Sequence, residues 1–296
     1  MEEGLGMGDE RQDATVELAG GSVQYVDTGG SGPVVLFVHG TPGGCDQGAL
    51  MGAFLADAGF RVIAPSRPGY LGTALHDGNA SPAQQADLHA ALLDHLGVDR
   101  FAVACWSGGG PSSYQLAIDR SSRVTSLVAI AAVSKPYTFE HPGQERILFG
   151  RPGTWLMKEL ARHAPKSTVK MLTTEEGDLP KAQAKELVET IWADEAKRDF
   201  VLRWLDTVTG RRKAGFDNDR EHFPELALDL AAVAAPVLLV HADTDSDVPA
   251  EHSEHAQALL PHAQLHTIEG GTHISVWTGP DDERARDRIV EHLRGS

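Results

Sequence analysis

A serine stands where a strongly apolar segment gives way to glycines, in Cys105-Trp106-Ser107-Gly108-Gly109. A serine on a sharp strand-to-helix turn is held out of the sheet, where it can act as a nucleophile. The residues two before and two after it must be small, because the turn brings backbone segments together. Gly109 meets this requirement, and Cys105 has a larger but still small side chain. The pattern predicts that Ser107 is a nucleophile; a glycine-rich turn without chemistry is the alternative.

The thiol of Cys105 is a competing nucleophile. If Cys105 occupied the turn, Val103 would stand two residues before it. Val103 is bulky and β-branched, so it does not suit that position. We therefore interpret Cys105 as a buried structural thiol.

A second motif, His39-Gly-Thr-Pro-Gly43, follows the unbroken apolar run Val34–Val38. Acyl transfer needs two backbone N–H groups for the oxyanion, one from the residue after the nucleophile and one from a loop of this kind. Pro42 has no N–H, so Thr41 is the expected donor in the loop and Gly108 the expected donor after the serine. We expect the histidine that opens the motif to shape the loop; the alternative is that it is the base.

Alternating strand and helix patterns must position these residues. Runs that are apolar on both faces suit buried parallel strands, and capped helical patterns separate them. The expected strands are 34–38, 61–65, 101–104, 124–133, 236–241 and 264–268, after a hairpin over 15–26 that turns at Gly20-Gly21. The expected helices are 46–58, 81–97, 108–120, 250–260 and 281–293. This order predicts an α/β fold with a doubly wound, mostly parallel sheet.

The alternation of strands and helices stops at Ser134. Residues 135–230 have apolar residues at helical spacing, as in 201–208, but no buried strand pattern. We expect one α/β core formed by 1–134 and 231–296, interrupted by a helical lid over 135–230. Because sheets of this kind bind ligands at the carboxyl ends of their strands, the lid should lie over the serine.

With the serine turn and the glycine-containing loop at these places, the chain resembles an α/β-hydrolase with a helical lid, from about Thr15 to its end. The resemblance implies a chain order of nucleophile, acid and histidine. The family's acid follows a small residue and two variable residues, and precedes two more, an aliphatic residue and proline. In Ala242-Asp-Thr-Asp-Ser-Asp-Val-Pro249 this pattern falls on Asp245. Its neighbours Asp243 and Asp247 are rivals, and the alternative is that all three cap the loop.

The same resemblance implies a glycine-flanked histidine after the last strand, and Gly270-Gly-Thr-His273 fits it. His273 would then take the proton of Ser107, and Asp245 would fix the imidazole tautomer. An acyl-enzyme would form and be hydrolysed by water. Dehalogenases and epoxide hydrolases of the family need a carboxylate where the serine stands, so they are excluded. The resemblance implies no cofactor and no metal.

A small or medium carboxylic ester is the expected substrate. Proline iminopeptidases have a loop similar to the second motif, with glycine where Thr41 stands, so such a peptidase is an alternative, as are a lactonase and a C–C bond hydrolase. A peptidase of this kind needs lid carboxylates to hold a substrate amine. Glu175, Glu176 and Glu186 are candidates, but we expect 173–178 to be a solvated turn. A relative of the fold that binds a ligand without turnover is the alternative from another class.

Composition sets the remaining limits. Of the 296 residues, 41% are hydrophobic and 23% charged, proportions typical of a globular chain with a sizeable core. The net charge of −16 disfavours nucleic acids and anionic membrane surfaces as partners. The sequence has only two cysteines, no apolar run of roughly 18 residues and no signal-like start. We therefore expect a cytoplasmic protein. The sequence leaves the oligomeric state open.

Overall fold

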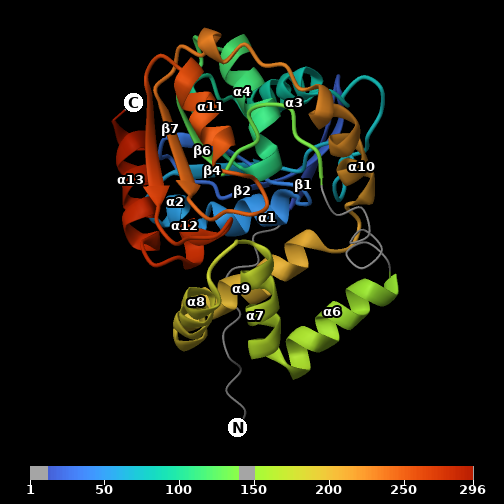
Figure 1. The fold of residues 1–296 in the computed structure, drawn as a ribbon. Coiled ribbons are helices and arrows are strands. Elements are labelled where there is room, and N and C mark those ends of the chain that lie inside the picture. The colour runs from blue at the N-terminus through green and yellow to red at the C-terminus, as the bar shows by residue number, and fades with distance from the viewer. Residues whose placement is uncertain (1–12, 140–150, 296) are drawn as a thin grey trace.

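An eight-stranded sheet runs through the middle of the molecule (Figure 1). The computed structural model describes residues 13–139 and 151–295. Within these ranges the strands are β1 (Ala14–Leu18), β2 (Gly21–Asp27), β3 (Val34–Val38), β4 (Arg61–Pro65), β5 (Phe101–Trp106), β6 (Val124–Ile130), β7 (Val237–Ala242) and β8 (Ala263–Ile268). Their order is β1-β2-β4-β3-β5-β6-β7-β8, with β1–β2 and β2–β4 antiparallel and the other neighbours parallel. The expected mostly parallel sheet is confirmed.

Helices cover both faces of this sheet. One face carries α1 (Cys45–Met51), α2 (Ala53–Asp57) and α13 (Asp282–Arg294), and the other carries α3 (Pro82–His95), α4 (Gly110–Asp119) and α11 (Glu251–Leu259). Successive residues of a strand point to opposite faces. In β3, Val35 and Phe37 accordingly pack in the hydrophobic cluster on the face covered by α1, α2 and α13. Leu36 and Val38 pack in the hydrophobic cluster on the face covered by α3, α4 and α11, which confirms the doubly wound arrangement.

A few element boundaries differ from those expected. The helix expected over 46–58 is broken at Gly52, between α1 and α2. Glycine is a weak helix former, and a Cβ at this position would lie 2.9 Å from the carbonyl oxygen of Gly48. The first hairpin turns at Ala19-Gly20, one residue earlier than expected. Strand β6 ends at Ile130 rather than at 133.

The segment between β6 and β7 is helical, as expected. Its described helices are α6 (Arg151–His163), α7 (Pro165–Glu175), α8 (Lys181–Ala193), α9 (Glu195–Val208) and α10 (Lys213–His222). Figure 1 shows α6–α9 grouped below the sheet, whereas α10 lies apart from them at the right. We call α6–α9 the four-helix segment; its α9 contacts α1 and the short helix α12 (Ser275–Thr278). Residues 140–150 of the expected lid lie outside the described residues, and the role of a lid stays a prediction.

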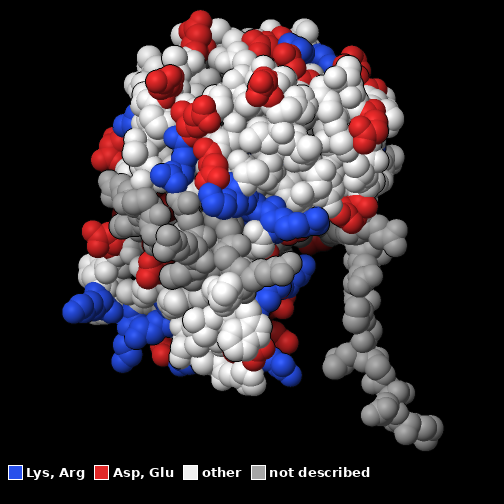
Figure 2. All heavy atoms as spheres, turned by 90° about the vertical axis from the view of Figure 1, so that its right-hand side faces the viewer, with Lys and Arg blue, Asp and Glu red and all other residues white. Residues whose placement is uncertain are grey.

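Charge is unevenly distributed over the surface. Figure 2 shows mostly acidic side chains over the upper part of one face, a band of basic side chains across its middle, and side chains of both signs in its lower part. Although the net charge is −16, that face is therefore not uniformly negative. Among the helices of the described ranges, none combines the length and the apolar character needed to cross a membrane.

Candidate active site

Ser107 lies on a sharp turn directly after β5. The strand ends at Trp106, a short 3-10 turn covers Ser107–Gly109, and α4 begins at the next residue. Ser107 has a φ of 54°, in the left-handed region that non-glycine residues seldom adopt. A Cβ at Gly109 would lie 2.5 Å from the carbonyl oxygen of Val38, so this position requires glycine. The strained turn and the small neighbour match the expected nucleophile geometry.

Cys105 lies in the core beneath this turn and is fully buried. Burial raises the pKa of its thiol to about 12. A thiol in such an apolar environment stays protonated near neutral pH and is a poor nucleophile. These properties agree with the structural role that the sequence predicts.

The loop after β3 lies against the serine turn. A Cβ at Gly40 would lie 3.0 Å from the Cβ of Ser107, so the loop backbone passes close to the serine. A side chain at Gly108 would collide with the side chain of Thr41. The two expected oxyanion donors, Thr41 and Gly108, are therefore neighbours in space.

A buried ion pair holds the Thr41 side chain. Arg67 and Asp219 are each only 1% exposed at the side chain, and Arg67 donates from both terminal nitrogens to the two Asp219 oxygens at 2.8 Å. The Thr41 hydroxyl donates to Asp219 at 2.5 Å and accepts from Arg67 at 2.8 Å. Tyr70 adds a hydrogen bond to Asp219 at 2.6 Å. Asp219 belongs to α10, so a residue from the inserted helices fixes the loop.

His39 also serves this loop. Its Nδ1 lies 2.7 Å from the carbonyl oxygen of Gly40, and its Nε2 accepts from the backbone N–H of Arg67 at 2.9 Å. Burial, reinforced by the charge of Arg67, lowers the pKa of His39 well below its usual value. The neutral ring thus carries its proton on Nδ1, and both nitrogens are used within the loop. This agrees with the expected loop-shaping role.

Asp245 lies just beyond β7 and contacts His273. Its Oδ2 lies 2.6 Å from Nδ1 of His273 and 3.2 Å from Nε2 of His241. Its Oδ1 accepts from the backbone N–H groups of Asp247 and Val248, both at 3.0 Å. Burial alone would raise the pKa of Asp245, but the two histidines outweigh it and hold the pKa below its usual value. The carboxylate is therefore ionised and fixed in place.

The rival Asp243 has a different partner. Its Oδ1 accepts from the backbone N–H of Gly270 at 2.7 Å, so it caps the loop after β8. His241, which the sequence analysis missed, also contacts Asp245. Its position at the end of β7, four residues before Asp245, was the available signal.

The loop after β8 holds His273 between the sheet and the inserted helices. Its backbone N–H donates to the carbonyl oxygen of Glu176 at 2.8 Å. Its carbonyl oxygen accepts from the indole of Trp106 at 3.1 Å, and the two rings are 4.7 Å apart. Since Trp106 directly precedes Ser107, these contacts bring the expected base beside the serine turn.

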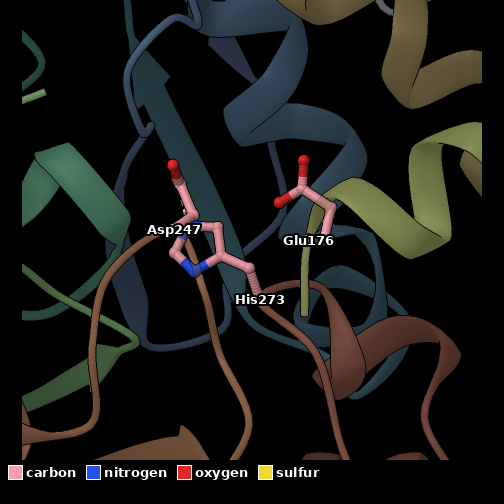
Figure 3. A group of neighbouring side chains, drawn as sticks. All are labelled: Glu176, Asp247 and His273. Carbon is pink, nitrogen blue, oxygen red and sulfur yellow. Dashed lines mark ion pairs between the residues drawn. The ribbon is translucent and has the colours of Figure 1, made fainter. Parts of the chain in front are cut away.

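Two further carboxylates lie near Nε2 of His273 (Figure 3). The nearer oxygen of Asp247 is 3.3 Å from this nitrogen. Ligand atoms of Glu176, Asp247 and His273 all lie within 4.8 Å of one another, a spacing at which a metal ion could be held. Burial would lower the pKa of His273, but Asp245 and Asp247 outweigh it and raise the pKa to about 9. Burial and repulsion from Asp247 raise the pKa of Glu176 to about 8.

The prediction that 173–178 is a solvated turn is only partly right: Thr174, Glu175 and Asp178 are exposed, but the stretch begins inside α7 and its other residues are covered. Thr173 is buried in α7, and Glu176 is half-buried. The backbone N–H of Asp178 donates to the carbonyl oxygen of Thr244 at 2.8 Å. Part of this polar stretch contacts the loop that carries Asp245. Local composition cannot tell such a contact from exposure to solvent.

A cavity of about 600 Å³ lies between these residues and the four-helix segment. Its lining is mostly apolar, with carboxylates at one side. The lining residues are Thr41, Pro42, Trp106, Pro136, Tyr137, Thr138, Phe139, Met157, Met171, Leu172, Glu175, Glu176, Trp204, Leu205, Val208, Phe216, Ser246, Asp247, Pro249 and His252. The cavity thus adjoins the loop after β3 and the turn that carries Ser107, as a substrate site would.

Comparisons with known proteins agree with this architecture. The family model described as alpha/beta hydrolase fold matches residues 33–280, so the chain belongs to this family. The uncharacterised hydrolase YcgS of Bacillus subtilis is 28% identical over 280 residues, 92% of this chain and 95% of that protein. A 2-hydroxy-6-oxononadienedioate/2-hydroxy-6-oxononatrienedioate hydrolase of Burkholderia vietnamiensis is 26% identical over 92% of this chain and 91% of its own length.

Among solved structures, an alpha/beta hydrolase fold protein from Nakamurella multipartita superposes with a TM-score of 0.91. It is 41% identical, and the match covers 96% of this chain and 100% of that one. The hydrolases among these relatives support an enzyme.

Proposed function

We propose that this alpha/beta hydrolase is a serine hydrolase that cleaves a small or medium carboxylic ester. Ser107 is its nucleophile, His273 its base and Asp245 the acid that orients the base. The observation that carries the proposal is the buried 2.6 Å contact between Asp245 and Nδ1 of His273, next to a serine on a strained turn. Because Asp245 contacts Nδ1 of His273, Nε2 is the nitrogen that exchanges a proton with the serine.

The reaction proceeds in two halves. The Ser107 oxygen bonds to the ester carbonyl carbon while its proton passes to Nε2 of His273. The oxyanion is stabilised by the N–H groups of Thr41 and Gly108, each contributing on the order of 3 kcal/mol. His273 returns the proton to the leaving alcohol, and water then hydrolyses the acyl-enzyme by the same steps.

The four-helix segment acts as the lid in this proposal. Met157, Leu172 and Trp204 from three of its helices line the cavity and suit the apolar part of an ester. Excluding water strengthens the electrostatic interactions that stabilise the oxyanion.

A second candidate is a proline iminopeptidase-like activity. It is favoured by Glu175 and Glu176, because both line the cavity and can hold a substrate amine. An amide, however, also needs its leaving nitrogen protonated, and Thr41 adds a β-branched side chain where those peptidases keep glycine. Ester cleavage is therefore the favoured reaction.

The test is a panel of p-nitrophenyl esters of rising chain length, assayed beside proline p-nitroanilide. We expect kcat/KM for p-nitrophenyl acetate or butyrate to far exceed that for proline p-nitroanilide, with Ser107→Ala inactive on both. A proline p-nitroanilide value equal to or above the ester values would replace the ester proposal by the peptidase.

A further inference from the structure

The cavity has carboxylates but no basic residue among its described lining residues. Glu175, Glu176 and Asp247 line one side of it, and the remaining side chains are neutral. His252 belongs to the neutral group, because burial and the nearby Lys135 lower its pKa to about 4. Taken together, these groups make the cavity a poor environment for an anionic substrate.

Two of the carboxylates lie close to the reacting centre. Figure 3 shows Glu176 and Asp247 on two sides of the His273 ring, and we call these two residues the carboxylate pair. Glu176 follows α7 of the four-helix segment, whereas Asp247 follows β7 of the core. Their oxygens and a ring nitrogen of His273 lie within 4.8 Å of one another.

His273 provides an independent sign that a ligand belongs there. Its Nε2 is buried and has no hydrogen-bond partner among the described residues, although Asp247 lies 3.3 Å away. A buried polar atom without a hydrogen bond is costly, which marks this space as one that a substrate enters.

We propose that the carboxylate pair is a subsite for a cationic nitrogen of the substrate, placed next to the scissile carbonyl. The cationic nitrogen contacts the carboxylate pair and leaves Nε2 of His273 for the serine proton. This inference rests on the proposed function and names its substrate class, an ester that carries an ammonium group. The nitrogen belongs either to the acyl part, as in an amino acid ester, or to the alcohol part, as in an amino alcohol ester.

Charge balance favours a cation over other ligands. Burial and the charge of Asp247 favour the protonated form of Glu176, and an ammonium group between the two residues favours its ionised form while donating up to three hydrogen bonds. An ammonium group at Asp247 also weakens the pairing of this carboxylate with His273. The neutral imidazole, which the base must be, is then favoured when substrate is bound.

A metal ion is a weaker explanation of the same three groups. It would bind Nε2 of His273, the atom that must accept the serine proton in the proposed reaction. An ammonium group contacts the carboxylates and leaves that nitrogen available. The Burkholderia vietnamiensis relative is named for a dianionic substrate, which the carboxylates in this cavity would repel.

The first experiment measures binding without turnover. The probes are 3-methylbutylamine, which is cationic at pH 7 as lysine is, and 3-methylbutan-1-ol, its neutral counterpart. Calorimetric titration of the full chain should give a dissociation constant roughly tenfold lower for the amine. Glu176→Gln and Asp247→Asn should each remove most of this preference and leave the alcohol affinity unchanged. The unchanged alcohol affinity shows that the cavity is intact.

Glu186→Gln is the matched control, because Glu186 is an exposed carboxylate of α8 and does not line the cavity. Its amine preference should equal that of the unchanged protein. Equal binding of amine and alcohol, or a preference that survives both variants of the carboxylate pair, would overturn the proposal. Zinc binding that outcompetes the amine and is lost in the same variants would assign the site to a metal instead.

The second experiment identifies the part of the substrate that carries the nitrogen. Leucine methyl ester is compared at pH 6.5 with methyl 2-hydroxy-4-methylpentanoate, and butyrylcholine with 3,3-dimethylbutyl butyrate. A higher kcat/KM for leucine methyl ester than for its neutral counterpart places the cationic nitrogen in the acyl part. A higher kcat/KM for butyrylcholine than for its neutral counterpart places it in the alcohol part. If neutral esters are cleaved through Ser107 and neither cation is preferred, the cation subsite fails while the proposed function stands. If no ester is cleaved, the proposed function fails, and the titration alone decides the cation subsite.

Discussion

The ends of the core strands and the four-helix segment form opposite sides of one cavity, but they are built differently. Ser107 and His273 are each 2% exposed and lie within the packed core. In the four-helix segment, Trp155 is 64% and Leu156 58% exposed, although neighbouring side chains line the cavity. The groups proposed for the chemistry are thus held by the core, whereas the four-helix segment supplies many of the apolar side chains that line the cavity.

Ion pairs in the two regions differ in the same way. The buried pair Arg67–Asp219, with Asp219 on α10, fixes the loop that is proposed to bind the oxyanion. Lys166–Glu189, between α7 and α8, has side chains that are 47% and 52% exposed. Solvent and salt screen such a surface pair, whereas a buried pair is sensitive to the loss of either partner. The difference predicts where substitutions will have large effects.

Removing the nucleophile should have the largest effect. Ser107→Ala is expected to lower kcat on the order of a millionfold, as in other serine hydrolases with a triad. A fluorophosphonate probe should label the unchanged protein and Cys105→Ala, but not Ser107→Ala. Labelling that survives Ser107→Ala and disappears in Cys105→Ala would transfer the role to the thiol.

Neutralising the acid should have the next largest effect. Asp245→Asn is expected to lower kcat by about 10⁴, because an amide stabilises the wrong tautomer of His273. Asp243→Asn is the matched control, since Asp243 contacts the backbone of Gly270. If Asp243→Asn causes the loss and Asp245→Asn does not, the assignment of the acid is wrong by two residues.

The buried ion pair should matter for stability as well as rate. Asp219→Asn leaves the Arg67 guanidinium without its carboxylate and should lower the free energy of unfolding by roughly 3–5 kcal/mol. It should also reduce kcat by up to roughly a hundredfold, since the Thr41 hydroxyl loses its charged carboxylate partner. Urea unfolding and ester hydrolysis measure the two effects. Glu189→Gln should change neither, and equal losses in both variants would contradict the contrast between the regions.

The smallest expected effect is a change in pH dependence. The pKa of His273 is raised to about 9, so about one molecule in a hundred has a neutral base at pH 7. For p-nitrophenyl acetate, kcat/KM should therefore rise with pH up to about 9. Asp247→Asn removes one of the charges that raise this pKa, so its profile should shift to lower pH and its rate at pH 7 should increase severalfold. Unchanged profiles in the two proteins would mean that Asp247 does not act on His273.

Local sequence was sufficient for most elements of the core and for the strained turn. Gly109 and the residues around Ser107 predict that turn because its requirement is steric and local. The acid needed a spacing rule, and the contact of Asp245 with His273 agrees with it. The break at Gly52 was not foreseen, since a single glycine inside a helical pattern is compatible with a continuous helix.

Sequence by itself thus determined the chain order of the core strands and helices, the candidate nucleophile and the loop expected to bind the oxyanion, and the family resemblance added the candidate acid and base. Tertiary structure alone decided that Asp219 pairs with Arg67 across 152 residues. It also decided that Glu176 meets Asp247 beside His273 rather than facing solvent. Backbone turns follow from neighbouring residues, whereas pairs between distant residues exist only where the folded chain brings them together. A carboxylate in a polar stretch therefore looks the same in the sequence whether its partner is water or a buried side chain.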